Sequence, residues 1–174
     1  MRIPILLLML CCIAHPSLAQ DRPDPPTLAG VIAASTASDW RTPDPADLLY
    51  LDLSGGRVVI ELADAFAPEH ARNMRTLARQ HYWDGLAIVR VQENYVVQWG
   101  DPAADESGAR SLGEARSKVP AEFTRPARGL AFTRLSDGDV YAFHVGWSEG
   151  FPVARDAKQE DTWLTHCYGM VGAG

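Results

Sequence analysis

The sequence predicts a mainly β fold with helices, in which neighbouring strands pair antiparallel. Two stretches rich in β-branched and aromatic residues, 49–62 and 88–101, are each broken by a short turn. Strands joined by so short a turn pair antiparallel, because parallel pairing needs a long crossover. An amphipathic helix pattern lies between the two stretches, at 67–78. The chain has 174 residues, 47% hydrophobic and 22% charged, which suits one domain with a sizeable core.

The first nineteen residues have the pattern of a secretory signal peptide. A basic start at Met1-Arg2 precedes an apolar run at 3–14, and Ser17-Leu18-Ala19 suits a cleavage site. The run is too short to span a bilayer comfortably. We therefore expect cleavage after Ala19, a periplasmic or secreted protein, and no stable membrane insertion afterwards. A retained membrane anchor is the alternative.

Residues 20–47 are rich in proline, alanine and small polar residues, as in Asp21-Arg22-Pro23-Asp24-Pro25-Pro26. Because proline at this density interrupts regular elements, we expect a flexible tether, with a short helix between Ala29 and Ser38. The folded domain is expected at 48–174.

The charge and the cysteines limit the possible partners. Cleavage of the signal leaves 15 basic residues against 22 acidic ones, a net charge of −7. No basic cluster is dense enough to neutralise phosphates, which argues against nucleic acid as a partner. Cys167 is then the only cysteine, so an intramolecular disulfide is excluded, and we expect this side chain to be buried and inert.

The first predicted hairpin joins strands at 49–53 and 57–62 through the glycine turn of Ser54-Gly55-Gly56. In the helix at 67–78, Pro68 suits the first turn and Glu69 suits the positive end of the helix dipole. Its apolar face consists of Ala71, Met74, Leu77 and Ala78.

The second predicted hairpin has its turn at Gln92-Glu93-Asn94. Side chains alternate between the two faces of a strand, so Arg90 and Gln98 can meet on one face, above a floor of Tyr95 and Val96. Such a groove can hydrogen-bond a peptide backbone while it buries an apolar group.

This hairpin resembles the core motif of the cyclophilin-type peptidyl-prolyl isomerases, which reads Phe-His-Arg-Val-Ile, Pro-Gly, Phe-Met-Ile-Gln-Gly-Gly-Asp. Aligned without a gap, Arg90 falls on the family's catalytic arginine and Gln98 on its substrate-binding glutamine. Tyr95 and Val96 replace the Phe and Met of the proline pocket. Upstream, the family order of Ala-Pro, Asn-Phe and Tyr-x-Gly is matched by Ala67-Pro68, Asn73-Met74 and Tyr82-Trp83-Asp84-Gly85. The departures are Ile88-Val89 for Phe-His, Glu93-Asn94 for Pro-Gly, and Trp99 for the first Gly.

The carboxy-terminal part is similar to the family only at its end. Residues 102–163 are interpreted as an insertion, with short strands expected at 129–134 and 140–147. The segment 163–174 resembles the family strand ending in Met-Ala-Asn-Ala-Gly, which places Ala173 on a pocket alanine and Gly172 on a substrate-binding asparagine. The residues that complete the family's proline pocket and form its closing strands come after this motif and are not in this sequence. The resemblance therefore implies an incomplete antiparallel β-barrel, cyclophilin-like, and part of a longer protein.

The resemblance implies a peptidyl-prolyl cis-trans isomerase that assists the folding of exported proteins, with proline-containing polypeptides as substrates. Arg90 and Gln98 are the expected catalytic residues; Tyr95, Val96, Gly172 and Ala173 would bind substrate. The chemistry needs no cofactor and no metal. The alternative is a non-catalytic relative that binds proline-containing peptides or holds unfolded chains. For Arg90 alone, the alternative is a structural ion pair with a carboxylate such as Asp101.

Other candidate groups point to no further chemistry. The histidines at 70, 81, 144 and 166 lack metal-ligand spacing, so we expect no metal site. Glu122 and Asp139 are interpreted as solvated surface carboxylates. No nucleophile and base occur together in a recognisable catalytic motif, which disfavours an unrelated β-rich hydrolase.

Overall fold

The computed structural model describes residues 24–104, 106–136, 140 and 142–173, so the expected signal peptide lies outside the described residues. The chain divides into two compact units, Met1–Trp40 and Arg41–Gly174. In the first unit, helix α1 (Leu28–Ala34) falls where the sequence predicts a short helix, and the 3₁₀ helix η1 (Ala37–Asp39) follows it. Neither element contains a buried residue.

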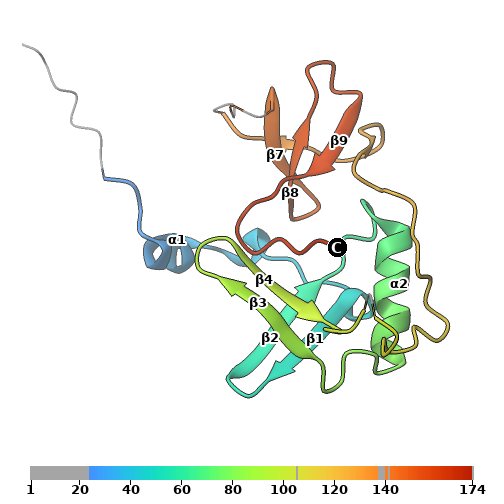
Figure 1. Cartoon of the computed structure of the whole chain (residues 1–174). Coiled ribbons are helices and arrows are strands. Elements are labelled where there is room, and N and C mark those ends of the chain that lie inside the picture. Colours follow the sequence, from blue (N-terminus) through green and yellow to red (C-terminus); the bar gives the residue numbers. More distant parts are fainter. Residues whose placement is uncertain (1–23, 105, 137–139, 141, 174) are drawn as a thin grey trace, which may run out of the picture. The chain divides into compact units, whose positions relative to one another are not determined.

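The second unit begins with the 3₁₀ helix η2 (Pro45–Asp47) and continues into two separate antiparallel hairpins (Figure 1). Strands β1 (Leu48–Leu53) and β2 (Gly56–Glu61) pair in register from Leu48 opposite Glu61 to Leu53 opposite Gly56. Gly56 has a φ of 141°, a region that favours glycine, which explains the glycine turn found in the sequence. Strands β3 (Ala87–Gln92) and β4 (Val96–Gly100) form the second predicted hairpin.

Helix α2 (Pro68–Arg79) lies between the hairpins in the sequence and confirms the predicted helix. Pro68 occupies the first turn, and Ala71 and Leu77 are buried on the predicted apolar face. The residue before the helix, Ala67, offers no side chain to cap it. The exposed N–H groups of the first turn must therefore find an acceptor elsewhere.

A five-stranded antiparallel sheet occupies most of the segment interpreted as an insertion, in the order β5-β9-β8-β7-β6. Its strands are β5 (Arg125–Pro126), β6 (Thr133–Arg134), β7 (His144–Ser148), β8 (Phe151–Arg155) and β9 (Asp161–Leu164). Val153, Ala154 and Thr162 are almost completely buried in this sheet. The segment is thus a folded part of the domain.

Several details of this sheet differ from the prediction. Of the strands expected at 129–134 and 140–147, the described residues form only β6 at Thr133–Arg134 and β7 at His144–Ser148. The strand expected to continue to the end of the chain stops at Leu164, and 165–173 form coil and a turn. The sequence analysis did not predict β8, because Pro152 lacks a backbone donor and therefore disfavours a strand. The turn before β8 explains its presence: Glu149 and Gly150 have φ values of 52° and 87°, the positive pair that suits a two-residue hairpin.

The three sheets do not close into a barrel within the described residues, in agreement with the incomplete barrel that the sequence implies. An aromatic pair joins two distant parts of the second unit. The rings of Phe66, just before α2, and Phe151, in β8, meet edge to face with centroids 5.9 Å apart. Arg41 lies over the Phe151 ring at 5.4 Å and donates two 2.6 Å hydrogen bonds to Glu61 of β2.

We expect Phe66→Ala to lower the free energy of unfolding by about 3–5 kcal/mol, because it empties a buried ring site and loses the contact with Phe151. Urea unfolding followed by circular dichroism measures this change. Phe123→Ala is the matched control, since Phe123 is 85% exposed and Phe66 only 5%. Equal effects of the two substitutions would contradict the assignment of Phe66 to the core.

Candidate functional site

The β3–β4 hairpin presents Arg90 and Gln98 side by side. Arg90 pairs with Gln98 and Ile88 with Trp99, so Val89 is an extra residue that forms a β-bulge. Bulges of this kind redirect side chains, and they are frequent beside active sites. The Tyr95 N–H donates to the Gln92 carbonyl at 3.1 Å and closes the turn.

Three groups surround the Arg90 guanidinium. Its Nη1 donates to the side-chain oxygen of Gln98 at 3.3 Å, and its Nη2 donates to that of Gln92 at 2.7 Å. The Tyr95 ring lies beneath it, with its centroid 5.5 Å from Cζ. The predicted meeting of a guanidinium and an amide on one face is confirmed as geometry; the catalytic roles of Arg90 and Gln98 remain predictions.

The alternative partner of Arg90, Asp101, is occupied elsewhere. Its carboxylate accepts hydrogen bonds from the backbone N–H groups of Arg110 at 2.6 Å and Ala103 at 2.9 Å. The Arg110 N–H, followed by the Ala103 N–H, lowers the pKa of Asp101 below its ordinary value. Asp101 therefore orders the loop after β4, and the described hydrogen-bond acceptors of Arg90 are two neutral amides.

The four predicted substrate-binding residues fall into two groups. Tyr95 and Val96 belong to the Arg90 hairpin: Tyr95 is 74% exposed, and Val96 is half-buried opposite Gln92. Gly172 and Ala173 are exposed coil residues beyond β9. No hydrogen bond among the described residues joins Gly172 or Ala173 to the hairpin, so their role stays a prediction. Cys167, expected to be buried, is exposed, which corrects that expectation.

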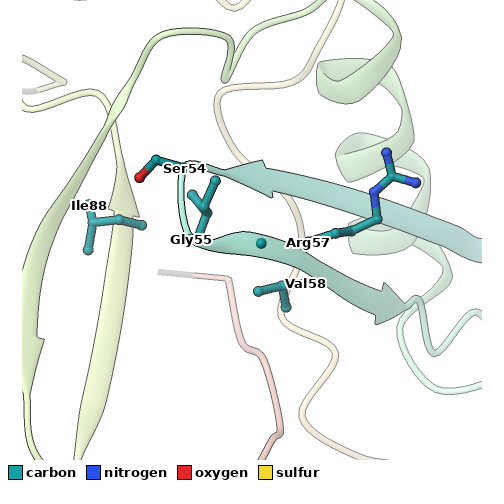
Figure 2. A pocket seen from close by; sticks show the side chains of 7 residues that line it. Ser54, Gly55, Arg57, Val58 and Ile88 are labelled. Atoms are coloured by element: carbon teal, nitrogen blue, oxygen red, sulfur yellow. The ribbon is translucent and has the colours of Figure 1, made fainter.

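Two open hollows lie near the hairpins, and neither is lined by Arg90 or Gln98. The larger, of about 810 Å³, is bordered by β1, α2 and the start of β3, with Ile88 and Trp99 in its wall. The smaller, of about 450 Å³, lies at the β1–β2 turn, toward which the Ile88 side chain is directed (Figure 2). Because Trp99 and Gln98 are consecutive on β4, their side chains point to opposite faces. The larger hollow therefore lies behind the polar cluster.

Sequence analysis did not predict the contacts of two polar residues, Gln92 and Glu122. Gln92 was interpreted only as part of a turn, yet it makes the shorter of the two amide contacts with Arg90. Glu122 was interpreted as solvated surface, yet its carboxylate accepts the backbone N–H groups of Glu69 and His70, each at 3.0 Å. The His70 Nδ1 lies 2.7 Å from the same carboxylate. The sequence shows that Ala67 cannot cap the start of α2, so an acceptor from elsewhere is needed, but it does not identify Glu122 as that acceptor.

The environment of Glu122 changes its proton affinity. Burial of the carboxyl raises its pKa, but the N–H groups of His70 and Glu69, with the His70 ring, outweigh burial and hold the pKa below its ordinary value. The charged form of Glu122 is therefore the one that the folded protein stabilises, and it lies at the positive end of the helix dipole.

We expect Glu122→Gln to reduce stability by about 1 kcal/mol at neutral pH, since it removes the charge that caps α2. A group whose pKa is lowered by folding stabilises the protein above its unfolded-state pKa. The difference between the two proteins should therefore shrink as the pH falls through the folded-state pKa of Glu122. Urea unfolding at a series of pH values measures it. Glu106→Gln, at an exposed position, is the control; a pH-independent difference would contradict the cap.

Within the part of the chain that the structure describes, no three His, Cys, Asp or Glu side chains gather as metal ligands would. None of the described helices is both long and apolar enough to cross a membrane.

Comparison with known proteins gives a consistent result. A family model described as cyclophilin type peptidyl-prolyl cis-trans isomerase/CLD matches residues 48–174. Peptidyl-prolyl cis-trans isomerase-like 1 of Homo sapiens is 32% identical over 81 residues, which cover 47% of this chain and 46% of the relative. Peptidyl-prolyl cis-trans isomerase ppi1 of Schizosaccharomyces pombe is 39% identical over 62 residues, which cover 36% of this chain and 40% of the relative. The chain thus spans less than half the length of these curated relatives.

Proposed function

The chain belongs to the cyclophilin-type peptidyl-prolyl cis-trans isomerase family, and from this membership we propose that it isomerises X-Pro bonds in exported polypeptides, with Arg90 as the catalytic side chain. The observation that carries the proposal is the surroundings of Arg90. Its guanidinium is exposed, contacts only neutral amide acceptors among its described hydrogen bonds, and shares a face with Gln98.

Rotation of the X-Pro bond needs a hydrogen-bond donor; it does not need a nucleophile or a general base. Amide resonance sets a barrier of roughly 18–20 kcal/mol to rotation of the peptide bond. When the X-Pro bond is twisted, resonance is lost and the proline nitrogen regains a lone pair that can accept a hydrogen bond. A donor directed at that nitrogen stabilises the twisted state and leaves the planar one unaffected, which is the condition for faster turnover.

Arginine suits this role better than lysine because its charge is permanent and its five N–H donors are fixed in one plane. Two of the Arg90 donors are used by Gln92 and Gln98, which leaves three for a substrate. The Gln98 amide group also carries N–H donors, and a substrate carbonyl is their natural acceptor. The exposed Tyr95 ring beside the guanidinium offers an apolar surface for the proline ring.

We expect Arg90→Ala to lower kcat/KM for a proline-containing peptide by roughly 10²–10³-fold, the usual cost of losing a donor to the transition state. A protease-coupled isomerisation assay measures the rate, and circular dichroism checks the fold. Arg57→Ala is the matched control, because Arg57 is also an exposed strand arginine stacked on a tyrosine, Tyr50, at 4.7 Å. An active Arg90→Ala variant would rule out the proposed role.

A non-catalytic peptide-binding function is the second candidate, favoured by the exposed apolar side chains of the same hairpin, such as Val91 at 71% and Val97 at 54%. The two functions separate in one experiment. A folded chain that binds a proline-containing peptide in titration calorimetry, yet leaves the isomerisation rate unchanged, would be a binding module.

Export is proposed from the signal pattern at residues 1–19. Expressed with a carboxy-terminal tag in a Gram-negative bacterium, the chain should be recovered from the periplasmic fraction with Gln20 as its first residue. Intact-mass measurement checks the cleavage point. Ala19→Arg, which places a bulky charge at the cleavage site, should leave the signal uncleaved. A full-length cytosolic product from the unmodified chain would contradict export.

A further inference from the structure

We propose that Gln92 is a positioning residue, which holds the Arg90 guanidinium in the orientation that catalysis requires. The inference rests on the proposed isomerase function and adds to it a residue outside the predicted catalytic pair. Gln92 is the last residue of β3, two positions after Arg90, so the two side chains lie on the same face of the strand.

The contact of Gln92 with Arg90 is the closer of the two amide contacts. Gln92 accepts from Nη2 at 2.7 Å, whereas Gln98 accepts from Nη1 at 3.3 Å. Acceptors on both terminal nitrogens, with the Tyr95 ring 5.5 Å below, restrict rotation of the guanidinium plane. A plane held in this way keeps the remaining donors directed to one side.

The backbone of Gln92 is itself fixed. Its carbonyl accepts the Tyr95 N–H at 3.1 Å across the turn, and Gln92 pairs with Val96 at the end of the hairpin ladder. The side chain therefore starts from a defined position, although it is exposed. An exposed arginine has many rotamers, and ordering it costs entropy; an acceptor on a fixed backbone removes part of that cost before substrate arrives.

The chemistry of the acceptor also matters. A neutral amide orients the guanidinium without neutralising its charge, so the donors stay as strong as those of a free arginine. With Gln92 holding Nη2, the longer contact of Gln98 can open at small cost, and the Gln98 amide can turn toward a substrate carbonyl. The family motif has Ile at this position, which offers no acceptor, so this support is a property of the present chain.

The test compares Gln92→Ile and Gln92→Glu with the unmodified full chain. We expect Gln92→Ile to lower kcat roughly three- to tenfold, the usual effect of one lost hydrogen bond, with KM and the melting temperature almost unchanged. Gln92→Glu restores an acceptor and should recover part of kcat, because its carboxylate orients the guanidinium but also offsets its charge. The control is Glu93→Leu, which removes a neighbouring exposed polar side chain that makes no described hydrogen bond to Arg90.

A double-mutant cycle separates positioning from a structural role. In an Arg90→Ala background, Gln92→Ile should have no further effect on the rate, because the group that it positions is gone. An equal loss in both backgrounds, or a loss that follows the melting temperature, would overturn the inference. An unchanged kcat in Gln92→Ile beside an inactive Arg90→Ala variant would also overturn it, while leaving the proposed function intact. If Arg90→Ala were fully active, the proposed function would fail first.

A second measurement tests the inference without turnover. Nitrogen-15 relaxation of the Arg90 Nε–H group reports the order of the guanidinium on the picosecond to nanosecond timescale. We expect the order to fall in Gln92→Ile, to be retained in Gln92→Glu, and to be unchanged in Glu93→Leu. The same order in all four proteins would show that Gln92 does not hold Arg90, whatever the activity.

Discussion

The backbone pairing of Arg90 with Gln98 is the constraint on which the candidate site depends. A slip of one residue between β3 and β4 would turn the side chains of one strand to the opposite face and separate the guanidinium from the Gln98 amide, while Gln92 would stay with Arg90 on β3. The turn closed by Gln92 and Tyr95 fixes one end of the register, and Asn94, with a φ of 55°, accepts the left-handed conformation that this turn requires. The bulge at Val89 then lets Ile88 line the apolar hollows while Arg90 faces the opposite side.

A second set of contacts connects helix α2 to the segment that follows the β3–β4 hairpin. The segment between β4 and β5 has little regular structure, yet it is attached to α2 at two places. Glu122 caps the first turn of the helix, and Asn73 exchanges two hydrogen bonds with the backbone of Arg116, at 3.1 and 2.8 Å. Arg116 also pairs with Glu69 at 2.7 Å. Glu122 thus satisfies helix N–H groups for which the local sequence supplies no cap, and the contacts of Arg116 attach the same segment to helix side chains.

The sequence predicts well where structure is set by near neighbours. Both hairpins and α2 follow from alternation, short polar or glycine turns and the position of Pro68, all of which act over a few residues. Glu122 could not be assigned because its partners lie about fifty residues away, and β8 was hidden by Pro152. Gln92 shows a different limit. Alternation places it on the Arg90 face, but a residue at the edge of a turn gives no sign of whether its side chain points to solvent or folds back on a neighbour.

The exposure of the Arg90 cluster bears on how it can act. Water competes for the donors of an exposed guanidinium, so its hydrogen bond to a twisted amide strengthens only when the substrate itself excludes water. In the proposed mechanism, a proline ring placed beside Tyr95 and Arg90 would shield the guanidinium from water, and substrate binding would thereby create the environment in which the donor is effective. Under these conditions the orientation of Arg90 before binding matters more than the depth of a preformed pocket. In the proposed mechanism, two neutral acceptors and one aromatic ring on a single hairpin provide that orientation.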